Sequence, residues 1–183
     1  LPLTAPHTPI LPSARFRGRS GTNAYGDFCL EVDDAVGRLR RVLESCGQAD
    51  QTVFIFTSDN GCSPMADLAA LEKLGHRPSC HFRGHKADIY EGGHRIPLLV
   101  SWPGVIEPGS TCDQTVCLSD LFATCAEIVG ADPGPGAGED SFSNLDVWRG
   151  LASLPVRETT IHSSIDGSFS IRAGRWKLEL CAG

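Results

Sequence analysis

A short apolar run followed by polar turn residues constrains this chain more than any other feature. Val53 to Phe56 are β-branched or aromatic and lack a helical period, which is the pattern of a strand buried on both faces. Such strands usually lie parallel to their neighbours, under covering helices. The run stops at Ser58-Asp59-Asn60-Gly61, so a carboxylate and an amide follow the carboxyl end of the strand. In open α/β sheets, ligands bind at that edge.

Asp59 and Asn60 carry the oxygen atoms that a hard cation prefers. Neighbouring side chains on a strand point to opposite faces, so both can hold one ion only if the strand has already ended. Gly61 permits the sharp turn that this arrangement needs. Calcium or magnesium suits these ligands better than zinc or copper. The competing interpretation is an Asp-Asn-Gly turn that only leaves a strand, and this stretch alone favours the turn.

The composition excludes several functional classes. The chain has 183 residues, of which 41% are hydrophobic and 21% charged, values typical of a soluble globular protein. Its net charge of −6 argues against non-specific nucleic-acid binding, which needs a basic face. No apolar run approaches the roughly 20 residues of a membrane span. The chain begins at Leu1 without a signal-peptide pattern, so we expect a fragment whose targeting signal is out of view.

The cysteines do not form a recognisable metal or redox pattern. None of the eight belongs to a CxxC pair, so a zinc ribbon or a thioredoxin-type site is not expected. Several fall on apolar faces of predicted helices, where cysteine behaves as a small hydrophobic residue. Their number leaves the redox compartment undetermined.

Helical and strand patterns alternate along most of the chain. Apolar residues at three- and four-residue spacing predict helices over 25–46 and 118–129, the second with Ser119 as its N-cap. Ser63-Pro64 predicts the start of a short third helix. A second buried strand is predicted over 96–102. This order of helices and buried strands indicates the α/β class.

The pattern changes after Leu154. Apolar and polar residues alternate there, and a hairpin is predicted around Ala173-Gly174. We therefore divide the chain into an α/β domain over 1–153 and the start of a small antiparallel subdomain over 154–183. The strands predicted in the second part are 159–162, 168–172 and 175–180.

Residues 77–97 form a long irregular stretch rich in charge and glycine. Loops of this length inside compact domains are often functional. Lys86 could pair with an anion as a compact charge. Glu91 and Arg95 are predicted to form an internal ion pair, and His85 is interpreted as structural.

Residues 1–19 contain four prolines and have no periodicity, so an extended segment is predicted. His7 lies within it, between prolines that stiffen the backbone. Taken alone, His7 reads as a loop histidine exposed to water.

Together these stretches resemble the sulfatase family, in its arylsulfatase A-like branch. They keep the family's order and cover nearly the whole chain, and this ordered combination reverses the bland interpretations of His7, Asp59, Asn60 and Lys86. The similar stretches are Ala5-Pro6-His7-Thr8-Pro9, Tyr25-Gly26-Asp27 with Val36-Gly37, Thr57-Ser58-Asp59-Asn60-Gly61, Arg83-Gly84-His85-Lys86, Tyr90-Glu91-Gly92-Gly93-His94-Arg95-Ile96-Pro97, Trp102-Pro103-Gly104 and Arg172-Ala173-Gly174-Arg175-Trp176-Lys177-Leu178.

The resemblance implies an alkaline-phosphatase-like mixed sheet flanked by helices, and hydrolysis of sulfate esters with calcium. Asp59 and Asn60 match the second pair of metal ligands. Lys86 matches the lysine that binds the sulfate group, and His7 matches the histidine near the leaving oxygen. A cation would neutralise charge as the S–O bond breaks, while lysine and histidine stabilise charge or protonate the leaving group.

The family's formylglycine nucleophile has no counterpart in this sequence. It is made from the cysteine of a Cys-x-Pro-x-Arg stretch, and the nearest match, Cys62-Ser63-Pro64-Met65-Ala66, has alanine in place of the arginine. We expect the nucleophile and the first metal ligands upstream of Leu1, in a missing N-terminal part of the same enzyme. The 183 residues alone are then expected to be inactive and to bind calcium weakly at best. The resemblance also implies a periplasmic, secreted or lysosomal-type protein.

Two alternatives stay open. One is a phosphatase or phosphodiesterase of the alkaline phosphatase superfamily, although those relatives usually use two zinc ions and several histidines, whereas Asp59-Asn60 offers no paired histidine. The other is a sulfatase-like binding protein without catalysis. The substrate is undetermined, because aryl esters, glycosaminoglycans and algal polysaccharides are all compatible.

Overall fold

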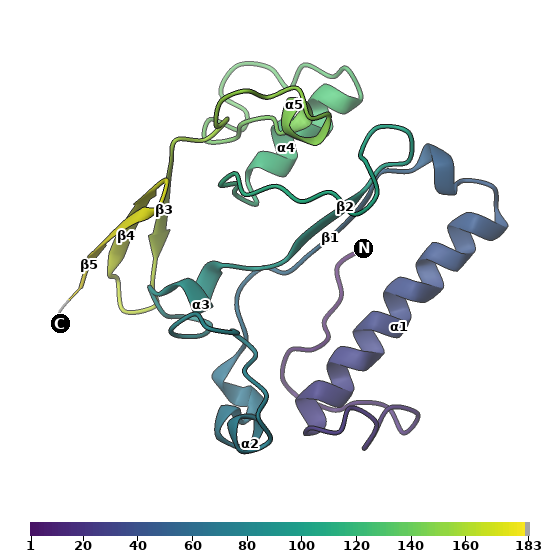
Figure 1. Ribbon diagram of the computed structural model, residues 1–183, viewed down its shortest axis with the longest axis vertical. Coiled ribbons are helices and arrows are strands. Elements are labelled where there is room, and N and C mark those ends of the chain that lie inside the picture. The colour runs from purple at the N-terminus through teal and green to yellow at the C-terminus, as the bar shows by residue number, and fades with distance from the viewer. Residues whose placement is uncertain (182–183) are drawn as a thin grey trace. The chain divides into compact units, whose positions relative to one another are not determined.

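The computed structural model describes residues 1–181, which contain helices and strands in two compact units. One unit comprises Leu1–Thr52 and Asn60–Leu98, and the other comprises Val53–Asp59 and the chain from Leu99 onward. None of the helices in residues 1–181 is long and apolar enough to cross a membrane. The elements, labelled in Figure 1, are α1 (Ala24–Ser45), η1 (Ala49–Gln51), β1 (Phe54–Thr57), η2 (Pro64–Ala66), α2 (Leu68–Lys73), α3 (Glu91–His94), β2 (Leu98–Ser101), α4 (Asp120–Ile128), α5 (Leu145–Trp148), β3 (Thr159–Ser163), β4 (Phe169–Ala173) and β5 (Trp176–Leu180).

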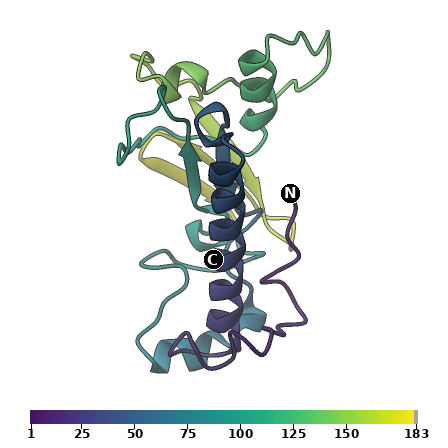
Figure 2. The same cartoon turned by 90° about the vertical axis from the view of Figure 1, so that its right-hand side faces the viewer.

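Helix α1 confirms the helix predicted over 25–46. Asn23 caps it, because its side chain accepts hydrogen bonds from the N–H groups of Tyr25 and Gly26 at 3.1 and 3.2 Å. Figure 2 shows α1 as one continuous helix. Gly47 follows it with a φ of +66°, the left-handed conformation that often ends helices.

The short helix predicted after Ser63-Pro64 is interrupted at Asp67. The 3₁₀ turn η2 comes first, and Asp67 then adopts a φ of +54°. The Asp67 carboxylate accepts a hydrogen bond from the Ala70 N–H at 3.1 Å and so caps α2. This segment is joined to the start of α1, because Asn23 Nδ2 donates to the Ala66 carbonyl at 2.7 Å.

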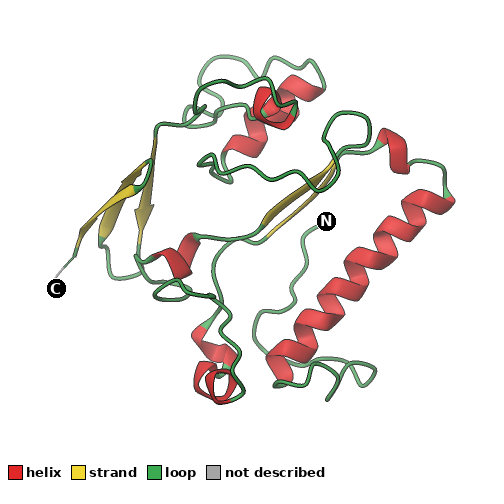
Figure 3. Cartoon of the chain, viewed as in Figure 1, coloured by secondary structure: helices red, strands yellow, loops and turns green. Residues whose placement is uncertain are grey.

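Strands β1 and β2 pair with each other, and Figure 3 shows them in yellow between long loops. All four residues of β1 are half-buried, and β2 alternates between half-buried and exposed residues. The sequence predicts strands that are buried on both faces, and that prediction is wrong for this chain. A two-stranded sheet has too few neighbours to enclose its own side chains.

Helix α4 starts at Asp120, two residues later than predicted. The predicted N-cap Ser119 makes no capping hydrogen bond. Its hydroxyl instead donates to the Asp140 carbonyl oxygen at 3.0 Å, so a tertiary contact competes with the cap. The short helix α5 has no counterpart among the predicted elements.

The sheet β3-β4-β5 is antiparallel throughout and confirms the predicted C-terminal strands. Ala173 pairs with Trp176, which leaves Gly174-Arg175 as the two-residue loop of a hairpin. Gly174 has a φ of +52° and Arg175 does not have a positive φ, which matches a type II′ turn with glycine at its first loop position. The hairpin therefore lies where the sequence predicts it.

This small sheet has a polar buried face and an apolar exposed face. Thr160 and Ser170 are only 5% and 2% exposed. On the other face Ile161, Ile171 and Leu178 stand opposite one another across the three strands. The exposed large apolar side chains of the sheet are Ile161, Phe169, Ile171, Trp176, Leu178 and Leu180.

Candidate functional site

The turn after β1 presents Asp59 and Asn60. Asp59 is exposed, and within residues 1–181 its carboxylate makes no hydrogen bond or ion pair. Asn60 is half-buried, and its Nδ2 donates to the Gly61 carbonyl at 3.0 Å. Because the amide nitrogen is used in this way, Oδ1 is the Asn60 atom that can ligate a cation. Both residues therefore offer hard oxygen at the end of a strand.

Gly61 fixes this turn against the glycine pair Gly92-Gly93. The Gly61 N–H donates to the Gly93 carbonyl at 2.9 Å. A Cβ at Gly61 would overlap the Gly92 carbonyl oxygen, and a Cβ at Gly92 would overlap the Gly84 carbonyl oxygen. The backbones pack so closely here that a side chain at either glycine would force them apart. The turn that carries Asp59 and Asn60 is therefore held in place by main-chain contacts.

Lys86 lies at the corner of a tight turn. The Asp88 N–H donates to the His85 carbonyl at 3.0 Å, and Ala87 has a φ of +82°. These are the features of a type II turn, whose third residue has a φ near about +80°. The Lys86 N–H donates to the Cys62 carbonyl at 2.8 Å, so the turn is fastened two residues after Asn60.

The side chain of Lys86 is available to an anion. Lys86 is half-buried, and within residues 1–181 no carboxylate lies within ion-pair distance of its ammonium group. An unpaired, partly desolvated ammonium attracts a ligand of opposite charge more strongly than a fully solvated one. The structure thus places an available cationic side chain on a turn that is hydrogen-bonded to Cys62, two residues after Asn60.

The hydrogen bonds of His7 go to neighbouring residues in its own segment. It is exposed, its N–H donates to the Thr4 carbonyl at 3.0 Å, and its Nδ1 lies 2.9 Å from the Thr8 carbonyl oxygen. Those are contacts with its own neighbours in the chain. The role predicted for His7 beside a sulfate group stays a prediction.

The loop between Lys86 and β2 contains the short helix α3, where the sequence predicts irregular structure. The predicted pair of Glu91 and Arg95 is confirmed, with Arg95 Nη1 3.5 Å from Glu91 Oε2. His94 Nε2 also lies 3.4 Å from Glu91 Oε1. Each carboxylate oxygen of Glu91 thus lies near one basic side chain, Arg95 or His94, and these contacts help to shape the loop.

Cys62 is poorly suited to act as a nucleophile. Burial raises the pKa of its thiol, although a hydrogen bond with Tyr25 opposes that effect. Burial likewise raises the pKa of Cys29 and of the Tyr25 hydroxyl, which hydrogen-bonds to Cys62. These three groups are therefore neutral at pH 7, and a neutral thiol is a weak nucleophile.

The described part of the chain contains no complete metal site by itself. Residues 1–181 hold no group of three or more His, Cys, Asp or Glu side chains that could bind a metal ion. Asp59 and Asn60 offer the donor type that calcium prefers, but calcium takes about six to eight oxygen ligands. Asp59 and Asn60 therefore fit calcium in donor type but not in number of ligands.

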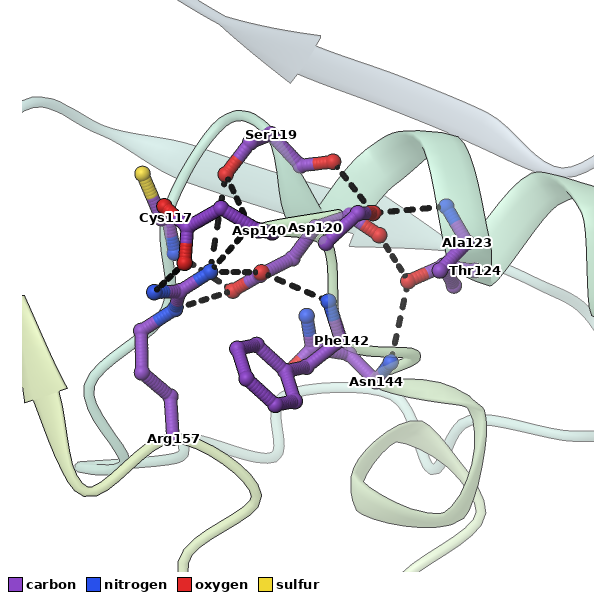
Figure 4. A network of polar contacts seen from close by, with 10 residues as sticks. Cys117, Ser119, Asp120, Ala123, Thr124, Asp140, Phe142, Asn144 and Arg157 are labelled. Atoms are coloured by element: carbon purple, nitrogen blue, oxygen red, sulfur yellow. Dashed lines mark hydrogen bonds and ion pairs between the residues drawn. The ribbon is translucent and has the colours of Figure 1, made fainter. Parts of the chain in front are cut away.

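A second polar cluster, shown in Figure 4, is buried in the other unit. Arg157 donates two hydrogen bonds to the Asp120 carboxylate, from Nε to Oδ2 at 3.1 Å and from Nη2 to Oδ1 at 2.5 Å. Its Nη1 also lies 3.2 Å from Asp140 Oδ1. The Arg157 and Asp120 side chains are 5% and 1% exposed. The pattern along the sequence does not reveal this pair, because it joins residues 37 positions apart.

The charges in this cluster stabilise each other. Burial alone would raise the pKa of Asp120, but hydrogen bonds from Arg157 and from the N–H groups of Cys117 and Phe142 lower it overall. The hydrogen bond to Asp120 in turn raises the pKa of Arg157. Every oxygen of the Asp120 carboxylate has a donor, so the cluster is interpreted as structural.

Comparison with known proteins identifies the family. The sequence profile of the Sulfatase family matches residues 2–131. N-acetylgalactosamine-6-O-sulfatase of Bacteroides thetaiotaomicron is 35% identical over 178 residues, covering 93% of this chain and 34% of the relative. Human arylsulfatase A is 34% identical over 177 residues, covering 93% of this chain and 33% of the relative.

The structural comparison agrees. A solved structure from a glycosaminoglycan-metabolism locus of Bacteroides thetaiotaomicron matches with a TM-score of 0.88 and 32% identity, covering 97% of this chain and 37% of its own. The chain spans about a third of the length of the curated relatives, 34% and 33%. From its motifs, its fold and these similarities, the chain belongs to the sulfatase family.

Proposed function

We propose that the whole protein hydrolyses sulfate esters, with Lys86 binding the sulfate group. The observation that carries this proposal is the half-buried Lys86, which has no carboxylate partner within residues 1–181 and is fastened to the turn that follows Asn60. A sulfate group carries negative charge in the bound ester and in the product. A fixed ammonium group stabilises that charge without reorganising during the reaction.

Asp59 and Asn60 are proposed to hold a calcium ion together with ligands from elsewhere in the whole protein. Their oxygen atoms are of the right kind, and the exposed Asp59 carboxylate has no competing protein partner within residues 1–181. When bound, the ion would supply a positive charge that polarises a sulfate oxygen. Asp59 therefore needs no rearrangement of an ion pair within residues 1–181 to serve as a ligand.

His7 is proposed to donate a proton to the leaving oxygen. An imidazole nitrogen can carry a proton and donate it to a neighbouring oxygen, which is the step that the leaving oxygen requires. The nucleophile is proposed to be a formylglycine outside this sequence, because no Cys-x-Pro-x-Arg stretch occurs in the 183 residues and the Cys62 thiol is neutral.

The test is a kinetic comparison in the whole protein. An aryl sulfate and N-acetylgalactosamine 6-sulfate serve as substrates. The matching phosphate esters are assayed separately, to test whether the protein is instead a phosphatase. Lys86→Ala should lower kcat/KM for sulfate esters about 100-fold or more, the usual effect of losing one charge-stabilising group. Asp59→Ala should raise the calcium concentration needed for activity.

Lys73→Ala is the matched control, because Lys73 is an exposed lysine of α2 in the same unit as Lys86. It should leave kcat/KM within about twofold, since a solvated surface lysine contributes little. Faster hydrolysis of the phosphate esters, or full activity of Lys86→Ala, would contradict the proposal.

A further inference from the structure

Asp88 forms two hydrogen bonds with His85, at the opposite end of the turn that carries Lys86. Its carboxylate Oδ2 accepts a hydrogen bond from the His85 N–H at 2.9 Å. Its own N–H donates to the His85 carbonyl at 3.0 Å. These two bonds hold residues 85 and 88 together, so the backbone of Lys86 between them has little freedom.

The turn needs such support because its backbone is strained. Ala87 has a φ of +82°, a conformation that residues other than glycine rarely adopt. Gly84 leaves room for the support, since a Cβ there would lie 2.8 Å from Asp88 Oδ2. Without the Asp88 carboxylate, the backbone of residues 85–87 would be free to relax toward a less strained conformation.

The same carboxylate also orients the His85 ring. His85 Nδ1 lies 3.3 Å from Asp88 Oδ2 and 3.2 Å from the Lys86 carbonyl oxygen. Both neighbours are acceptors, so Nδ1 must carry the proton in the neutral ring. The ring is therefore held in the tautomer with the hydrogen on Nδ1.

From this geometry we propose that Asp88 is a positioning residue for Lys86, acting through the backbone of residues 85–87. The inference rests on the proposed role of Lys86 in sulfate binding. It adds that the placement of the ammonium group depends on a carboxylate that itself touches no substrate. Two of the main-chain contacts of the turn, to Cys62 and to Asp88, would then set where the sulfate is held.

The kinetic test compares Asp88→Ala with Asp67→Ala in the whole protein. Each change removes an aspartate that accepts one backbone N–H in the same unit, His85 N–H in one case and Ala70 N–H in the other. Both should lower the unfolding temperature. Only Asp88→Ala should lower kcat/KM for a sulfate ester, by roughly 10- to 100-fold, because it misplaces Lys86.

Asp88→Asn provides the rescue. Its amide oxygen can still accept from the His85 N–H, so kcat/KM should recover to within about fivefold of the wild type if geometry is the cause. An equal effect of Asp88→Ala and Asp67→Ala would overturn the inference. Full activity of Lys86→Ala would instead remove the proposed function, so the two failures are distinguishable.

A spectroscopic measurement on the 183-residue chain needs no substrate. In ¹⁵N NMR spectra of the neutral His85 ring, the proton should lie on Nδ1. Asp88→Ala should shift the ring toward the commoner Nε2-protonated tautomer, while Asp67→Ala should leave it unchanged. An Nε2-protonated His85 in the wild type would overturn the contact on which the inference rests.

Discussion

At the scale of single residues, the left-handed Ala87 is the clearest point of strain in the candidate site. Its φ of +82° suits glycine at the third position of a type II turn. Ala87→Gly should therefore stabilise the folded chain by up to about 1 kcal/mol, because relief of strain exceeds the entropy that glycine adds to the unfolded state. Chemical denaturation monitored by circular dichroism measures the difference.

Ala70→Gly supplies the opposite control. Ala70 lies inside α2, where glycine costs about 0.5–1 kcal/mol relative to alanine. If Ala87→Gly destabilises the chain as much as Ala70→Gly does, the turn does not have the backbone conformation described above.

Asp27 provides a prediction about pH. Its carboxylate accepts hydrogen bonds from the N–H groups of Ser20 and Gly18 at 2.8 and 2.7 Å, and these lower its pKa below the usual 3.8. The stabilisation is thus complete above the unfolded value and is lost as the pH falls through the folded pKa. A ¹³C NMR titration of the Asp27 carboxyl carbon should show a midpoint below 3.8, and a midpoint at or above that value would contradict these contacts.

At the scale of elements, the pair of Arg157 and Asp120 joins the start of α4 to the segment that leads into β3. Both side chains are almost fully buried, so Arg157→Ala leaves an uncompensated carboxylate inside the protein. The free energy of unfolding should fall by about 3–5 kcal/mol. Urea denaturation followed by fluorescence would measure it.

Arg15→Ala is the comparison for this prediction. Arg15 also pairs with an aspartate, Asp34 at 3.1 Å, but its side chain is 62% exposed. Its loss should cost less than about 1 kcal/mol. Similar costs for the two arginine variants would show that the Arg157 pair is not buried in solution.

The success of prediction from sequence depended on how local each feature is. Helix α1 could be predicted because its periodicity and end signals lie within one segment, and the C-terminal hairpin followed from alternation around Gly174. Ser119 occupies the predicted N-cap position, but its hydroxyl bonds Asp140, 21 residues away, instead of capping the helix. The buried Arg157 pair was missed for the same reason.

The same distinction between local and long-range features applies to the candidate site. Asp59, Asn60 and Lys86 were predicted as site residues from short stretches with family resemblance, and their roles stay predictions. The structure links the segments of the last two, because the Lys86 N–H bonds the carbonyl of Cys62, two residues after Asn60. The contacts of Asp88 with His85 could not be predicted, since they depend on the direction in which an irregular loop turns. No periodic pattern encodes that direction.

At the scale of the whole molecule, the exposed large apolar side chains within residues 1–181 outnumber the buried apolar ones. The buried apolar residues are Ala66, Leu71, Ile89 and Leu145, whereas the outer face of β3-β4-β5 alone exposes more. The 183-residue chain should therefore bind the dye ANS strongly, as contiguous apolar surface does. It should also show no sulfatase turnover by itself, because it lacks the proposed nucleophile.

Leu178 and Leu74 allow a matched test of this surface. They are 59% and 57% exposed, but Leu178 lies among apolar neighbours on the sheet while Leu74 ends a short helix. Leu178→Ser should reduce ANS fluorescence more than Leu74→Ser. Equal reductions would mean that the sheet does not form a continuous apolar face, and turnover by the 183-residue chain would contradict the other half of the prediction.

The contacts that fasten the Lys86 turn to the residues after Asn60 come from main-chain groups of Gly61, Cys62, Lys86 and Gly93. Because every donor and acceptor in these contacts is a backbone atom, the join between the two segments does not depend on which side chain residue 86 carries. Lys86→Ala should therefore remove the ammonium group while leaving this join intact.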